Sequence, residues 1–135
     1  MGVDLIAFPE LALMGYPPLD LLSYSWVLNN VEKCIEELLP YTESIMVLIG
    51  LPSRNNKKGE KPYFNSVFAL YNGSIVNKYH KTLLPSYDIF DEDRFFQENE
   101  VFDILEFKGQ RIAISICEDL WYDKVLSYKV DPIQK

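Results

Sequence analysis

The sequence predicts an α/β fold, in which strands pack against a covering helix. Two apolar runs rich in strand-forming residues span positions 3–8 and 45–49. Between them, apolar side chains recur at spacings of three and four from Val27 to Leu38, which is the period of a helix with one buried face. Further along, Asn72-Gly73 separates two more apolar runs, and this dipeptide is a strong signal for a β-hairpin.

Composition and charge narrow the class of protein. The chain has 135 residues, of which 48% are hydrophobic and 24% charged, so it is neither disordered nor of low complexity. The net charge is −7 and no basic stripe is present, which argues against nucleic acid and anionic membranes as partners. No apolar run approaches the ~20 residues of a membrane span, and no secretory signal opens the chain. We therefore expect a cytoplasmic protein.

The first half of the chain is expected to contain a strand, a loop and the helix. Residues 3–8 have the continuous apolar character of a buried strand, which would deliver Glu10 at its C-terminal end. Residues 10–24 contain a glycine and two adjacent prolines, so we expect a loop or a broken helical turn. On the helix that follows, Cys34 lies on the apolar stripe, which favours core packing over a chemical role.

The second strand is expected to be short. It covers residues 45–49 and should stop at Gly50 and Pro52, because both residues interrupt regular structure. Residues 53–61 are polar and rich in lysine, which is typical of a surface loop.

Two hairpins are expected in the second half. Residues 63–71 and 74–79 flank Asn72-Gly73, and residues 101–107 pair with 111–116 around a turn at Lys108-Gly109-Gln110. The loop from 81 to 98 between them is long enough that we expect it to carry function.

The C-terminus has the pattern of a helix start. Asp131 is placed as N-cap, Pro132 as the first helical residue and Gln134 as the residue that completes a capping box. This helix has no body, and the first strand opens at residue 3. We therefore expect the sequence to be a piece of a longer protein.

Three residues with reactive side chains follow predicted strands: Glu10, Lys81 and Cys117. In sheet enzymes, ligands and reactive groups collect at the C-terminal ends of strands. A cysteine attacks as its thiolate, which a carboxylate can generate by taking the proton and a cation can stabilise. Lys81 and the backbone N–H of Glu118 are placed to stabilise an oxyanion. This combination predicts acyl transfer from an amide or nitrile through a thioester.

Three blocks of sequence, found in this order, resemble the nitrilase superfamily of carbon-nitrogen hydrolases. They run from Pro9 to Pro18, from Tyr79 to Glu92, and from Ile116 to Trp121. Within that superfamily, they are most similar to the glutamine amidotransferase domains of glutamine-dependent NAD(+) synthetases. The Cys-Glu-Asp triplet alone would be a weak signal, but three ordered blocks that span nearly the whole chain are a strong one.

The resemblance implies an αββα sandwich that is incomplete in this chain. Against the family pattern, the first strand and helix before Val3 and the part after Gln134 are missing. Residues 1–135 would then form a partial glutaminase domain. The synthetase domain, with its ATP and Mg, would lie outside this chain, and no cofactor or metal is implied within it. The implied partners are glutamine, the synthetase domain of the same longer chain and further copies in a homo-oligomer.

The resemblance also implies roles for individual residues. Glu10 would be the general base, Lys81 the transition-state stabiliser and Cys117 the nucleophile. Glutamine would be hydrolysed to glutamate and ammonia, which the synthetase domain would use to convert deamido-NAD to NAD with ATP. The glutamine pocket would be shaped by residues carried over by motif, with the first three the stronger candidates: Tyr87, Glu92, Trp121, Tyr16 and Phe90. The carboxylate of Glu92 suits the substrate's ammonium group, but in the wider superfamily a glutamate in this loop also assists the triad, and both roles stay open.

Two alternatives to this function stay open. The chain could be a stand-alone carbon-nitrogen hydrolase that acts on another small amide, or a non-catalytic truncated fragment. The single histidine, His80, is expected to make a structural hydrogen bond, since one ligand does not make a zinc site. The acidic run from Asp88 to Asp93 lacks the spacing of a calcium loop and is expected to be a solvated face with one substrate contact.

Overall fold

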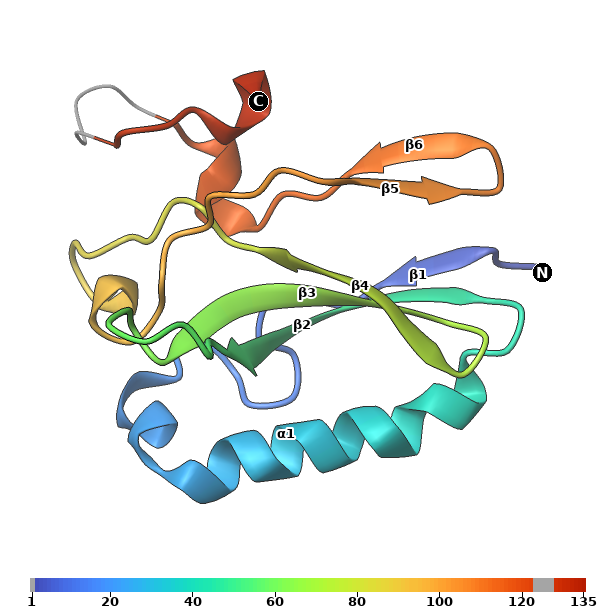
Figure 1. The fold of residues 1–135 in the computed structure, drawn as a ribbon, viewed down its shortest axis with the longest axis horizontal. Coiled ribbons are helices and arrows are strands. Elements are labelled where there is room, and N and C mark those ends of the chain that lie inside the picture. Colours follow the sequence, from blue (N-terminus) through green and yellow to red (C-terminus); the bar gives the residue numbers. More distant parts are fainter. Residues whose placement is uncertain (1, 123–127) are drawn as a thin grey trace.

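A computed structural model describes residues 2–122 and 128–135, and it confirms the α/β class (Figure 1). The main sheet is mixed, with the strand order β1-β2-β3-β4. Strand β1 (Leu5–Ala7) runs parallel to β2 (Met46–Arg54). The next two pairings are antiparallel, from β2 to β3 (Tyr63–Tyr71) and from β3 to β4 (Ser74–His80).

The two faces of the main sheet have different covers. Figure 1 shows the helix α1 (Ser25–Leu38) along one face and the antiparallel hairpin of β5 (Ile104–Phe107) and β6 (Gln110–Ala113) beside the other. Side chains alternate between these covers along β2. Ile49 and Leu51 pack with α1, whereas Met46 and Leu48 pack with the hairpin. The described residues thus form a helix layer, a mixed sheet and a separate hairpin, and they do not by themselves form all four layers of an αββα sandwich.

The helix and both hairpins lie where the sequence predicts them. Asn72 and Gly73 have φ values of 48° and 73°, as the predicted tight turn requires. The second hairpin is shorter than expected, because β5 begins at Ile104 instead of residue 101 and β6 ends at Ala113 instead of residue 116. Its turn is also one residue shorter, since Gln110 is already the first residue of β6. Asp131 caps the last turn as predicted by accepting a hydrogen bond from the Ile133 N–H. Short 3₁₀ turns connect the longer elements: η1 (Leu19–Ser23), η2 (Leu39–Tyr41), η3 (Glu92–Arg94), η4 (Cys117–Leu120) and η6 (Pro132–Gln134).

The expectation that the second strand stops at Gly50 and Pro52 is wrong, because β2 continues to Arg54. Gly50 lies against the loop that carries Glu10, and a Cβ atom there would come within 2.4 Å of the Pro9 carbonyl oxygen. The missing side chain therefore allows the two backbones to approach, and the strand itself is not broken. Pro52 is tolerated because the register of β1 with β2 ends at Leu48, which leaves Pro52 beyond that pairing.

The expectation of a buried first strand is also wrong. Ile6 is 38% exposed, and Ala7 is exposed as well. The reason is its position in the sheet, since within the described residues β1 pairs with β2 alone and lies at an edge. As for membranes, none of the helices in the described part of the chain has the length and apolar character needed to span one.

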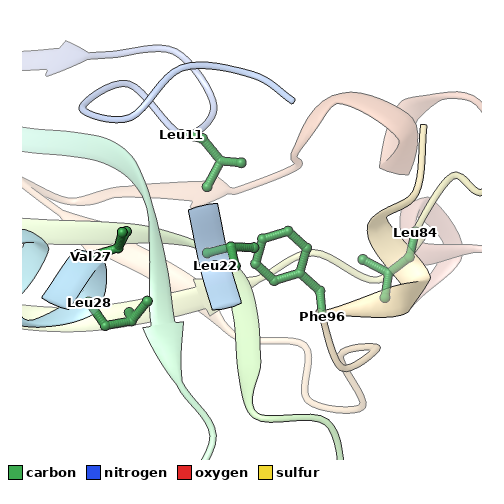
Figure 2. Packing of buried hydrophobic residues seen from close by; sticks show 6 residues of the cluster. All are labelled: Leu11, Leu22, Val27, Leu28, Leu84 and Phe96. Carbon is green, nitrogen blue, oxygen red and sulfur yellow. The ribbon is translucent and has the colours of Figure 1, made fainter. Parts of the chain in front are cut away.

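A separate apolar cluster supports the loops at the end of the sheet where the reactive residues lie. Figure 2 shows its side chains, which come from the first loop, the region around α1 and the long loop after β4. Leu11 directly follows Glu10, and Leu84 comes three residues after Lys81. Packing of these side chains against Phe96 and Leu22 therefore fixes two of the three chain segments that carry reactive groups.

Gly50→Ala is predicted to destabilise the protein, because the new methyl group would overlap the backbone of Pro9 and Glu10. We expect the free energy of unfolding to fall by roughly 1–3 kcal/mol, the usual cost of overpacking. The measurement is a urea titration of the protein expressed from its complete reading frame. Gly2→Ala is the matched control, since a Cβ at Gly2 meets nothing within 4 Å. Equal midpoints for the two variants would contradict the close approach.

Candidate active site

The structure brings Glu10, Lys81 and Glu92 into direct contact, although they lie far apart in the sequence. Lys81 directly follows β4, and its Nζ donates hydrogen bonds of 2.7 Å to Glu10 Oε1 and 2.7 Å to Glu92 Oε1. The Lys81 side chain is fully buried, and those of Glu10 and Glu92 are 15% and 2% exposed. Burial opposes the charge on Lys81, but the two carboxylates raise its pKa, so the side chain stays an ammonium ion.

Cys117 lies beside this group at the first residue of η4, and its residue is exposed. Its φ is 48°, an uncommon value for a residue with a side chain, which indicates a tight turn at this position. Desolvation of the sulfur raises the pKa of the Cys117 thiol, as do the charge of Glu10 and a hydrogen bond with it, while Lys81 opposes the shift. The thiol is therefore protonated at neutral pH and needs a base, and Glu10 is the adjacent carboxylate.

Glu92 is held by three hydrogen-bond donors. Besides Lys81, Tyr16 OH donates to its Oε1 over 2.5 Å and Asn65 Nδ2 donates to its Oε2 over 3.2 Å. Burial raises the pKa of Glu92, while Lys81 and Tyr16 lower it. Because the carboxylate is buried and already engaged, this geometry favours a role in holding Lys81 over direct contact with a substrate ammonium group.

The aromatic residues proposed for the pocket fall into two places. Tyr16 and Phe90 have ring centroids 5.9 Å apart, and Tyr87 and Phe90 are 5.4 Å apart, so these three rings form one group. The Tyr16 ring also lies 5.8 Å from Lys81 Nζ, which places the group beside the buried ion pairs. Trp121 is 71% exposed, and among the described residues its ring does not stack with any of these three.

Both the backbone and the side chain of Glu118 belong to the candidate site. Its backbone follows Cys117 in η4, where the sequence predicts an oxyanion donor. Its buried carboxylate accepts hydrogen bonds from Tyr87 OH at 3.1 Å and 3.0 Å and from Tyr128 OH at 2.9 Å. The residue next to Cys117 thus also fixes Tyr87, one of the aromatics expected to line a pocket.

Asp119 is a site residue that sequence reasoning missed. The residue is 4% exposed, and its carboxylate accepts hydrogen bonds from the backbone N–H groups of Thr82, Leu83 and Ile116, over 3.0, 2.8 and 3.1 Å. These bonds tie the segment after Lys81 to the segment before Cys117. The only signal in the sequence was the position of Asp119 in the Cys-Glu-Asp triplet, which says nothing about these partners.

Asn65 was also missed, and it contacts both carboxylates. Its Nδ2 donates to Glu10 Oε1 over 2.7 Å in addition to its bond to Glu92. Next to it on β3, Ser66 Oγ lies 2.8 Å from His80 Nδ1, which confirms the structural hydrogen bond expected for His80. Burial, together with Lys78, lowers the pKa of His80 to about 4, so this imidazole is neutral at physiological pH.

Comparison with known proteins places the chain in a family context. Residues 1–129 match the carbon-nitrogen hydrolase family. The chain is 39% identical over 143 aligned positions to a glutamine-dependent NAD(+) synthetase of Synechocystis sp., covering 98% of this chain and 25% of that protein.

Solved structures give the same picture. A glutamine-dependent NAD(+) synthetase from Acinetobacter baumannii, solved with adenosine diphosphate, superposes with a TM-score of 0.81 at 31% identity, over 92% of this chain and 23% of that one. An amidase of the nitrilase superfamily from Nesterenkonia shares the fold, with a TM-score of 0.72 at 19% identity over 90% of this chain and 45% of that one. The chain therefore spans about a quarter of the length of the synthetases that it matches.

Glu10→Gln is predicted to shift the titration of the Cys117 thiol to lower pH. The variant removes the negative charge that, after burial, contributes most to the raised pKa of this thiol. The measurement is the rate of alkylation by iodoacetamide as a function of pH, in a Cys34→Ser background so that one thiol reacts. Glu36→Gln, on the exposed side of α1, is the control and should leave the profile unchanged. A profile for Glu10→Gln that is unshifted, or shifted to higher pH, would show that Glu10 does not act on the sulfur.

Proposed function

The chain belongs to the carbon-nitrogen hydrolase family, and from this premise we propose that it hydrolyses the side-chain amide of glutamine through a thioester on Cys117. The observation that carries the proposal is the contact of the buried Lys81 ammonium with Glu10 beside this thiol. The ammonia released would serve the ATP-dependent amidation of deamido-NAD to NAD. The support is that the chain is similar to proteins named as glutamine-dependent NAD(+) synthetases.

The side chains can account for each proton transfer in this reaction. Glu10 takes the proton of the Cys117 thiol while the sulfur attacks the amide carbon, and the carbonyl electrons move onto oxygen. The Lys81 ammonium and the backbone N–H of Glu118 stabilise this oxyanion. When the carbonyl re-forms, the C–N bond breaks, Glu10 gives its proton to the leaving nitrogen, and ammonia departs. Glu10 then deprotonates a water molecule that cleaves the thioester, which releases glutamate and restores the thiol.

In this proposal, aromatic side chains near the triad form the substrate pocket. Tyr16, Phe90 and Tyr87 form the aromatic group beside the ion pairs, and Trp121 offers an exposed ring four residues after the nucleophile. We assign these rings to the walls of the glutamine pocket. Glu92 supports the triad through Lys81 and Tyr16 in this proposal.

We also propose that this chain is one part of a longer polypeptide. The described layers would belong to an αββα sandwich completed by further sequence. The synthetase domain, which would bind ATP and Mg, would be joined in the same polypeptide, and the assembled protein would be a homo-oligomer. The support is that the matched synthetases are about four times as long as the aligned segment.

A stand-alone amidase is the second candidate. The observation that favours it is the site itself, because Glu10, Lys81 and Cys117 act on the amide group, and none of the three distinguishes glutamine from another small amide. The two candidate functions therefore differ in whether a synthetase domain is joined to this domain and in which amide is the substrate.

Cys117→Ala is predicted to abolish glutamine hydrolysis, because no other group in the site can form the thioester. In the protein expressed from its complete reading frame, mass spectrometry should detect a γ-glutamyl adduct on the unmodified protein and none on the variant. Synthesis driven by added ammonia should continue, since it needs no amide cleavage. Cys34→Ala is the control and should retain the adduct. Loss of both glutamine-driven and ammonia-driven activity in Cys117→Ala would argue against this assignment.

The reading frame around this sequence is predicted to continue into a nucleotide-binding domain. Sequencing the gene on both sides tests this directly, and a Ser-Gly-Gly type phosphate loop downstream is the expected result. A stop codon soon after the sandwich is completed would favour the stand-alone amidase. A stop codon at Lys135 would favour a non-catalytic fragment.

A further inference from the structure

Asn65 lies at the centre of the buried polar group, although nothing in its sequence context indicates a chemical role. It is the third residue of β3, and the whole residue is 1% exposed. Its side-chain amide reaches Glu10 Oε1 at 2.7 Å and Glu92 Oε2 at 3.2 Å, while its backbone carbonyl accepts the Lys81 N–H at 2.8 Å. One residue therefore contacts the proposed base, the supporting carboxylate and the lysine.

The chemistry of the neighbours fixes the orientation of this amide. Both side-chain partners are carboxylate oxygens, which can only accept hydrogen bonds when ionised, so the NH₂ group of Asn65 must face them. The amide oxygen is then left on the other side, where it is buried and has no hydrogen-bond partner among the described residues. An unsatisfied buried acceptor disfavours the folded state. Stability alone therefore does not explain an asparagine at this position. What the asparagine contributes is the pair of N–H hydrogen bonds to the two carboxylates.

Asn65 and Lys81 bridge the same two carboxylates. Lys81 Nζ donates to Glu10 and Glu92, and Asn65 Nδ2 does the same, so the four groups form a closed ring of donors and acceptors. Both donors meet Glu10 on the same oxygen, Oε1. The second oxygen, Oε2, receives neither of these donors, so it stays available to the thiol of Cys117.

We propose, on the basis of the function argued above, that Asn65 is a positioning residue for the hydrolysis. Its amide holds Oε1 of Glu10, so that Oε2 faces the sulfur, and it keeps the two neighbouring carboxylates ionised without adding a second cation. Asn65 acts through Glu10 and lies behind it, and it has no contact with the reacting atoms of the amide.

The test compares two variants with one control in the protein expressed from its complete reading frame, in a Cys34→Ser background. Asn65→Asp keeps the shape of the side chain and replaces the donating nitrogen by oxygen, while Asn65→Ala removes the group. Asn77→Ala is the control. This asparagine lies on β4, and its amide oxygen accepts a hydrogen bond from the Lys78 N–H, which is not part of the site. Two readouts are measured against pH: kcat/KM for glutamine and the rate constant for alkylation of Cys117 by iodoacetamide.

Both Asn65 variants should lower both rates by roughly 10–100-fold, as loss of such supporting contacts commonly does. The acidic limb of the kcat/KM profile should move up by about one pH unit, because carboxylates that lose a hydrogen-bond donor ionise at higher pH. The alkylation profile, which follows the thiol, should also move up, because the charge of Glu10 is then less compensated and disfavours the thiolate. The charged and titratable groups that face the carboxylate pair are Lys81, Tyr16 and Cys117, and all three are retained in these variants. Asn65→Asp adds a third carboxylate, which shifts the profiles in the same direction, so Asn65→Ala isolates the loss of the donor. Asn65→Ser, which restores one donor, should recover part of the alkylation rate relative to Asn65→Ala.

The two readouts separate the possible failures. Alkylation needs no substrate, and its rate constant is measured on the folded protein. A variant that is less stable but still folded at the assay temperature would therefore keep the same rate constant for alkylation. If Asn65→Asp and the control have superimposable alkylation profiles, the positioning role is overturned, whatever happens to glutamine. If alkylation shifts as expected but the unmodified protein does not hydrolyse glutamine, Asn65 keeps its role and the proposed substrate is wrong.

Discussion

The buried ammonium group of Lys81 is the constraint on which the rest of the site depends. Moving a cation out of water costs on the order of several kcal/mol, and this is offset only where partners of opposite charge are close and well oriented. Here the partners are Glu10 and Glu92, each 2.7 Å from Nζ. The two carboxylates in turn repel each other, so they need further donors, which Tyr16 and Asn65 supply. A buried cation therefore implies a whole polar group around it.

The fold supports this group through contacts made outside it. Gly50 lets the loop with Glu10 lie directly on β2, and Asp119 joins the segment after Lys81 to the turn at Cys117. The apolar cluster around Leu11 and Leu84 holds the same two segments from the other side (Figure 2). Because three distant segments must meet within hydrogen-bond distance, rigid packing near them matters as much as the reactive groups themselves.

The sequence predicted the elements that are determined by residues close to one another in the chain. The turn at Asn72-Gly73 follows from the positive φ that both positions need, and α1 follows from its apolar period. The course of β2 past Gly50 was not predictable in this way, because a close tertiary approach explains the glycine. At the site, reactive side chains at strand ends indicated Glu10, Lys81 and Cys117 as candidates. Asn65 and Asp119 carry no such signal, since their importance comes from partners far away in the sequence.

Register within the sheet decides whether Asn65 and Lys81 can share a site at all. Near the turn, Tyr71 pairs with Ser74 and Leu70 with Ile75, a register that would set Asn65 opposite His80. A bulge between Ala69 and Leu70 shifts the pairing by one residue, so that Ser66 faces His80 and the Asn65 carbonyl binds the Lys81 N–H. Opposite residues project to the same face of a sheet, and a shift of one residue exchanges the faces. Without the bulge, the imidazole of His80 would lie beside Asn65, and the ammonium group would point to the other side of the sheet. The electrostatics of the site are thus set by one extra residue in β4.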